Sequence, residues 1–82
     1  MTTAYVLINC KLGKEADVVE NLKHVDSVKE VQKTFGAYDV IAKVENTKTK
    51  QVRDTVAWNI SSMNDVRSTL TLTADPTKIQ ND

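Results

Sequence analysis

The sequence has 82 residues, and its 11 basic and 11 acidic side chains give a formal net charge of +0 at pH 7. A chain of this length forms one domain with a small core, and it lacks the basic excess that is typical of a nucleic-acid-binding face. It has no apolar run of the ~20 residues that a membrane-spanning helix needs, no basic segment at its start that would indicate a signal peptide, and one cysteine, which excludes an internal disulfide. We therefore expect a soluble protein of the cytoplasm.

The first predicted element is a strand over residues 4–10. Its side chains are apolar at both alternating positions, with Tyr5 and Leu7 on one face and Val6 and Ile8 on the other. Strands of this kind are covered on both faces. We therefore expect this strand in the middle of a sheet.

A helix and two further strands are predicted next. Residues from about 14 to 24 carry valine and leucine at helical spacing. Residues 28–35 form a polar-leaning strand that is typical of a sheet edge, because its lysine side chains discourage stray pairing. Residues 39–45 form the third strand. Gly36 lies between these two strands, and we expect it to adopt the positive φ angle of a tight hairpin.

A second helix is predicted over residues from about 49 to 61, with Asn46 or Thr47 as its cap. Trp58 lies away from the inward-facing stripe of this helix. The side chains expected on the stripe are Val52, Val56, Asn59, Ile60 and Met63.

The last predicted strand covers residues 66–74 and alternates between an apolar and a polar face. The apolar face carries Val66, Leu70, Leu72 and Ala74, with Ser68 among them, and the polar face carries Arg67, Thr69, Thr71 and Thr73.

The predicted order is therefore β-α-β-β-α-β. Two right-handed β-α-β units joined in this way give an α+β, ferredoxin-like fold, with a four-stranded antiparallel sheet and both helices on one face. The first and third strands are expected in the centre of the sheet, and the second and fourth at its edges. We assign residues 1–75 to a single domain and residues 76–82 to a polar C-terminal tail.

This arrangement leaves one face of the sheet without helices, although the first strand is apolar on both faces. Tyr5 and Leu7, joined by Ile41, are expected on the uncovered face, and exposed apolar surface of this kind usually marks an interface. We therefore expect two copies to pair sheet against sheet, as in a dimeric α/β barrel. Trp58 is a candidate for a further contact between subunits, because tryptophan is enriched at interface anchors; the alternative is a partly exposed helix residue.

Three motifs occur in an order and at a spacing that resemble a known family. They are the Ala-Tyr-Val-Leu-Ile strand at residues 4–8, the Gly-Ala-Tyr-Asp turn at residues 36–39 and the closing strand at residues 66–72, which contains a Thr-x-Thr pattern. The chain resembles the ligand-binding (RAM) domain of the Lrp/AsnC transcription regulators, in its stand-alone form, over residues from about 4 to 74. The resemblance implies that domains pair through their sheets, that dimers assemble into rings, and that amino acids bind between dimers.

The same resemblance implies a set of ligand-binding residues. Carried over by position, they are Gly36, Ala37, Tyr38, Asp39, Thr69 and Thr71. The Asp39 carboxylate suits an α-ammonium group, backbone N–H groups around Gly36 suit an α-carboxylate, and the threonine hydroxyls add selectivity.

The sequence departs from the family's regulators in two respects. The helix-turn-helix domain with which those regulators begin is not part of it, and connectors that often read Pro-Gly are here Asp26-Ser27 and Asn64-Asp65. The expected function is an oligomeric amino-acid-sensing module, without membrane contact, that regulates transcription through partner proteins, including full-length Lrp/AsnC regulators, and not by direct DNA binding.

Two other functions stay open. Ferredoxin-like sheet dimers include small monooxygenases and isomerases, but only Cys10, His24, Tyr38 and Asp39 could serve such an enzyme, and they form no set of nucleophile, base and orienting group. The other alternative is an assembly protein with a vestigial pocket. Each site residue also has a purely structural interpretation: a turn at Gly36, sheet cover at Tyr38, a lysine partner for Asp39, and ordinary strand formers at the threonines.

No cofactor and no metal site is expected. The sequence has neither a CxxC nor an HxxxH pattern. His24 is expected to be a solvated or helix-end cation, and the sequence does not decide whether it takes part in an incidental metal site. Cys10 ends an apolar strand, which favours packing over a nucleophilic role.

Overall fold

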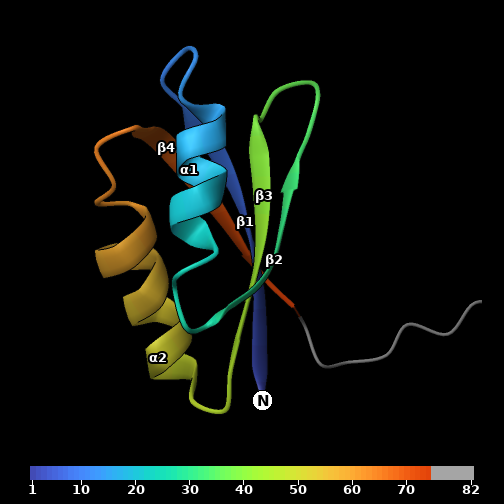
Figure 1. Cartoon of the computed structure of the whole chain (residues 1–82). Coiled ribbons are helices and arrows are strands. Elements are labelled where there is room, and N and C mark those ends of the chain that lie inside the picture. The colour runs from blue at the N-terminus through green and yellow to red at the C-terminus, as the bar shows by residue number, and fades with distance from the viewer. Residues whose placement is uncertain (75–82) are drawn as a thin grey trace, which may run out of the picture.

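The computed structural model describes residues 1–74 of the chain. Its elements in chain order are β1 (Thr2–Cys10), α1 (Glu15–Leu22), β2 (Val28–Lys33), β3 (Val40–Asn46), α2 (Thr49–Asp54), the π-helix η1 (Thr55–Ile60) and β4 (Val66–Thr73). The strands form one antiparallel sheet in the order β2-β3-β1-β4, and the helices lie on one side of it (Figure 1). The predicted ferredoxin-like fold is therefore confirmed. The tail predicted over residues 76–82 lies outside the described residues.

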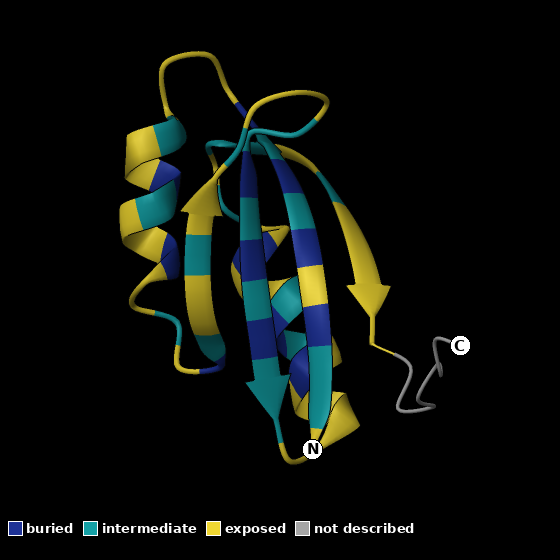
Figure 2. Ribbon diagram, turned by 90° about the vertical axis from the view of Figure 1, so that its right-hand side faces the viewer, coloured by how far each residue is buried: buried dark blue, intermediate teal, exposed yellow. Residues whose placement is uncertain are grey.

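The core lies between the sheet and the helices. Val6 and Ile8 point toward the helices, as predicted, and β3 contributes alternate residues to the same layer. Figure 2 shows this alternation of buried and less buried residues along the central strands. The fully buried side chains of the core are Ala4, Val6, Ile8, Val18, Leu22, Val40, Ala42, Val44 and Ile60. No helix among residues 1–74 is long and apolar enough to cross a membrane.

The opposite side of the sheet carries its own apolar surface. The register pairs Leu7 with Ile41 of β3 and with Leu70 of β4, and it pairs Tyr5 with Leu72. Because side chains alternate between the faces of a strand, these five residues share the face without helices, which we call the open face. Tyr5, Leu70 and Leu72 are 38%, 44% and 52% exposed. The apolar side of β4 therefore extends the uncovered surface that was predicted for β1.

A β-bulge changes the start of β4. Asn9 pairs with Ser68, but the next residue, Cys10, pairs with Val66, so that Arg67 is the extra residue in β4. Val66 consequently packs against the core. The prediction that Val66 shares a face with Leu70 and Leu72 is wrong, because strict alternation breaks at the bulge.

The second helix also differs from its prediction. The expected single helix is an α-helix up to Asp54 that continues as a π-helix. The wider π turn places Thr55 in the interior, 7% exposed, and leaves Asn59 exposed. Asn59 was therefore wrongly expected on the inward stripe. The stripe is confirmed at Val52 and Ile60, which are buried. The N-cap position is Lys48, which makes no side-chain capping bond; of the two predicted caps, Asn46 accepts the backbone N–H of Lys48 at 3.2 Å through its Oδ1.

The loop that contains Gly36 spans residues 34–39 and is longer than a tight hairpin. The Thr34 backbone N–H donates to the carbonyl of Asp39 at 2.9 Å, and the Thr34 hydroxyl donates to the carbonyl of Tyr38 at 2.7 Å. Gly36 has a φ of 117°. Its positive φ is confirmed, whereas the tight turn is not.

We expect Gly36→Ala to lower the free energy of unfolding by about 1–2 kcal/mol, because a side chain at this φ is strained. A Cβ at this position would meet no atom within 4 Å, so the loss is one of backbone conformation alone. Urea unfolding measures it, with Ala37→Gly as the control in the same loop. Equal stability of Gly36→Ala and the unmodified chain would show that the loop does not require the positive φ.

Candidate functional site

Asp39 is tied to the end of β1 at two points. Its backbone N–H donates to the carbonyl of Ile8 at 2.9 Å, and its Oδ2 accepts the backbone N–H of Cys10 at 2.8 Å. This partner is a backbone group and not a lysine of the neighbouring strand. A carboxylate accepts more than one hydrogen bond, so the contact with Cys10 fixes the side chain and leaves it able to bind a further donor.

Asp39 borders a surface hollow of about 370 Å³. The hollow forms where the end of β1 meets the beginnings of β3 and β4, and we call it the Asp39–Arg67 hollow. Arg67, the bulge residue, supplies a guanidinium group, and within residues 1–74 it forms no ion pair with Asp39. The lining residues are Asn9, Cys10, Asp39, Arg67 and Ser68.

Cys10 is among the residues that line this hollow, and it is buried, 6% exposed. Burial raises the pKa of the Cys10 thiol, and the nearby carboxylates of Asp39, Glu15 and Asp65 raise it further. A thiol with a raised pKa is protonated at neutral pH and is a poor nucleophile. The side chain therefore acts in packing, and it does not provide the reactive group that an enzyme would need here.

The rest of the Gly-Ala-Tyr-Asp turn is open to solvent. Gly36 and Ala37 are exposed, Tyr38 is half-buried, and Phe35 just before them is fully exposed. Within the described part of the chain, no imidazole or reactive thiol completes a catalytic set around Asp39. The turn thus presents backbone groups and one aromatic side chain at its tip.

Thr69 and Thr71 lie on the helix side of the sheet. Thr69 pairs with Ile8, and its hydroxyl is 3.1 Å from the hydroxyl of Ser61. Thr71 borders a groove of about 290 Å³ between β4 and the second helix, which we call the α2–β4 groove. It is lined by Val52, Arg53, Val56, Ala57, Ser61, Thr71 and Thr73. Within one chain the structure therefore places Thr71 and Asp39 at separate hollows, and Thr69 lines neither of the two.

The sequence did not single out Asn9, Arg67 or Ser68 as site residues. The signal that could have found them is the antiparallel register, which brings the start of β4 beside the end of β1 and thus beside Asp39. Arg67 was assigned to the face of Thr69; the register places it at this end of the molecule, and the bulge leaves it as the extra residue there.

The remaining candidates lie elsewhere. Tyr5, Leu7 and Ile41 lie on the open face, and Trp58 is 75% exposed on η1. His24 follows α1, and its Nε2 is 3.6 Å from a carboxylate oxygen of Glu20. Among residues 1–74, no group of three or more histidine, cysteine or acidic side chains is placed to hold a metal ion.

Comparison with known proteins identifies the domain. The family described as the Lrp/AsnC ligand binding domain matches residues 3–75. The chain belongs to the Lrp/AsnC family. The family assignment from the three motifs is thereby confirmed, and the domain is a ligand-binding domain of a family of transcription regulators. That family is regulatory, which agrees with the expectation of a protein that is not an enzyme.

Individual proteins that are similar to this chain agree with the family assignment. The HTH-type transcriptional regulator FL11 of Pyrococcus abyssi is 35% identical over 49 residues, which are 60% of this chain and 32% of that regulator, so the chain spans about a third of the relative's length. The crystal structure of FFRP-DM1 is 35% identical with a TM-score of 0.88 and covers 92% of this chain and 100% of its own. The crystal structure of TTHA0845 from Thermus thermophilus is 30% identical with a TM-score of 0.88, and the match covers 98% of this chain and 100% of that chain.

Proposed function

We propose that this Lrp/AsnC domain is an oligomeric sensing module of the cytoplasm. It binds an amino acid or a similar small molecule and regulates transcription through partner proteins, among them full-length Lrp/AsnC regulators. The match to a ligand-binding domain of transcription regulators supports the sensing role. The balanced charge of the chain supports action through proteins and not through direct contact with DNA.

The observation that carries the proposal is the pair of opposite charges in the Asp39–Arg67 hollow. A free amino acid carries an ammonium and a carboxylate group on one carbon. The carboxylate of Asp39 accepts hydrogen bonds from the ammonium group, and the guanidinium group of Arg67 binds the carboxylate of the amino acid through two parallel N–H donors. The amide of Asn9 and the hydroxyl of Ser68, 3.3 Å apart, supply further polar contacts beside it.

We further propose that a second chain completes the site. Thr71 lines the α2–β4 groove, and Thr69 lies beside it, with its hydroxyl 3.1 Å from that of the groove residue Ser61. Neither threonine lines the Asp39–Arg67 hollow, so the residues implied by the family resemblance meet across a contact between chains. The groove is largely apolar, and the fully exposed Phe35 beside the turn is an apolar group that can fill it. A contact between two different surfaces repeats from chain to chain and can close into a ring.

The open face supports a separate, two-fold contact. Its five side chains form a contiguous apolar surface across β3, β1 and β4 that the helices do not cover. A second copy of the same face buries it, because like surfaces pair in a two-fold dimer. The module is thus built from sheet-to-sheet dimers.

We expect Arg67→Gln and Asp39→Asn each to weaken amino-acid binding by about tenfold to a hundredfold, since each removes one charged hydrogen-bonding partner. Isothermal titration with the standard amino acids, one at a time, measures the affinity. Asp39→Asn keeps an oxygen that can accept the Cys10 N–H. Lys50→Gln, which removes an exposed charge from α2, is the matched control.

Two results would count against this function. Unchanged affinity in Arg67→Gln would exclude the Asp39–Arg67 hollow as the ligand site. If no amino acid released heat or raised the melting temperature of the unmodified protein, the sensing role itself would be wrong.

A further inference from the structure

A second polar hollow lies at the other end of β3 from Asp39. It has a volume of about 410 Å³ and lies between the end of α1 and η1, and we call it the α1–η1 hollow. Residues 24–27 line it on one side, Asn46 at its base, and Gln51, Thr55 and Asn59 on the other side. Its size is within the range of small-molecule sites.

The wall of this hollow is polar and internally fixed. Ser27 and Thr55, each 7% exposed, are the buried polar side chains of the described chain, and both line it. The hydroxyl of Ser27 accepts the side-chain amide of Asn46 at 3.0 Å, and the hydroxyl of Thr55 donates to the carbonyl of Gln51 at 2.8 Å. Burial of polar groups is tolerated only when they are hydrogen-bonded, so these bonds hold a preformed polar surface.

The second helix gives this surface two more polar groups, Gln51 from α2 and Asn59 from the π-helix. It exposes Asn59 to the hollow, although the sequence pattern predicts that this residue faces the core. The side-chain amides of Asn59 and Gln51 form no hydrogen bond with any other residue in the range 1–74. Since π-helical segments often occur at functional sites, an exposed asparagine produced by one points to a ligand.

The electrostatics of the hollow favour a cation. Asp26 contributes a carboxylate, and no lysine or arginine among the described residues lines the hollow. The segment also follows the C-terminal end of α1, where the helix dipole is negative. Lys29 contacts Asp26 only at its backbone carbonyl, at 3.2 Å.

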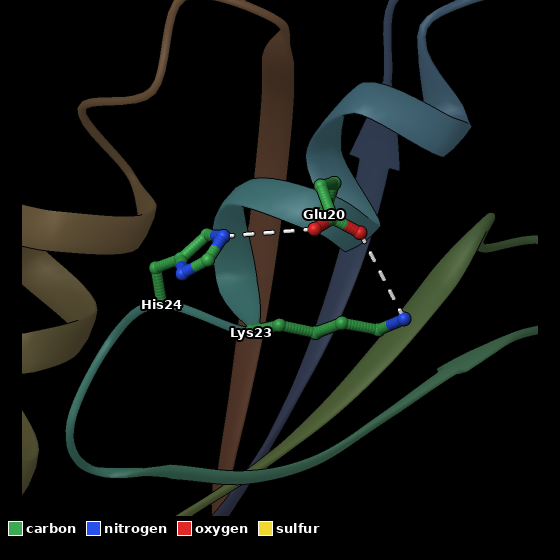
Figure 3. Close-up of polar contacts among 3 residues, drawn as sticks. All are labelled: Glu20, Lys23 and His24. Carbon is green, nitrogen blue, oxygen red and sulfur yellow. Dashed lines mark ion pairs between the residues drawn. The ribbon is translucent and has the colours of Figure 1, made fainter.

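A second carboxylate, that of Glu20, does not line the hollow but contacts His24, which does. Figure 3 shows Glu20 between His24 and Lys23, with its carboxylate oxygens 3.6 Å from His24 Nε2 and 3.9 Å from Lys23 Nζ. His24, which lines the hollow, is therefore paired with a carboxylate that Lys23 also approaches.

We propose that the α1–η1 hollow binds a small organic cation of the guanidinium class. A guanidinium group is planar and offers five N–H donors in a fixed arrangement. The carboxylate of Asp26 and the carboxamide oxygens of Gln51 and Asn59 are acceptors from three different segments that can receive such donors. This site is independent of the Asp39–Arg67 hollow and does not rest on the function proposed for it.

The test is an NMR titration of the full chain with methylguanidinium chloride, at constant total chloride, with acetamide as the neutral probe. We expect chemical-shift changes confined to residues 24–27 and to the side-chain amides of Gln51 and Asn59, with millimolar affinity for so small a probe. Asp26→Asn weakens binding by about tenfold or more. Asp17→Asn, an exposed change at the other end of α1, leaves it unchanged.

Asn59→Ala provides a second variant that folds, because the residue is exposed, and it also weakens binding. Shift changes that are absent or scattered over the surface would overturn the proposal. Equal binding of acetamide, or unchanged affinity in both Asp26→Asn and Asn59→Ala, would overturn it as well.

Discussion

The variant Leu72→Glu is expected to be a monomer at concentrations at which the unmodified chain is a dimer or a larger assembly. Leu72 is half-exposed on the open face, where it pairs with Tyr5. In a two-fold contact each substitution counts twice. Each copy loses about 1–2 kcal/mol of apolar burial and places a carboxylate against an apolar surface, so the dimer dissociation constant rises on the order of a thousandfold.

Sedimentation velocity at micromolar concentration measures this effect, and circular dichroism checks that the variant folds. Leu12→Glu is the matched control, because Leu12 is 95% exposed on the loop after β1 and away from the open face. A Leu72→Glu protein that sediments like the unmodified chain would show that the open face is not the dimer contact.

Leu22→Ala is expected to have the largest effect on stability. Leu22 is the last residue of α1 and is 0% exposed, packed where the helix meets the sheet. Removing a buried leucine costs about 2–5 kcal/mol, from lost burial and from the cavity that remains. A domain of this size has a total stability of roughly 5–10 kcal/mol, so the variant is expected to be partly unfolded near 37 °C.

Urea unfolding at a fixed protein concentration measures the loss, since association also contributes to the apparent stability. The midpoint should fall without a change in slope. Leu12→Ala makes the same chemical change at an exposed position and should alter stability by less than about 0.5 kcal/mol. Equal losses in the two variants would contradict the burial of Leu22.

The fold was predictable because its signals are local. Apolar side chains on both faces of β1 indicated a central strand. The positive φ of Gly36 was predicted from the residue type. The open face was also predicted, since two right-handed β-α-β units joined in this way place both helices on the same side of the sheet. By contrast, the π-helix that exposes Asn59 and buries Thr55 depends on how the second helix packs. The spacing of apolar residues in the sequence does not predict the wider turn of the π-helix.

The candidate site was predictable only in part. Asp39 was chosen from a motif, and the structure gives it a hydrogen bond from Cys10 that the motif does not specify. Arg67 was missed because it reaches the hollow through a bulge, and a bulge is a property of the pairing between two strands. Thr71 and Asp39 lie at different hollows because of the strand register, which the motifs do not specify.

We propose that an amino acid binds where the Asp39 turn of one chain meets the α2–β4 groove of another. The most direct test is isothermal titration of a co-expressed mixture of two defective chains, Asp39→Ala and Thr69→Val/Thr71→Val. Each parent alone should bind at least about tenfold more weakly. The mixture should recover full-affinity binding at a fraction of its sites, because some contacts combine an intact turn with an intact groove. A mixture that binds no better than its parents would contradict the account.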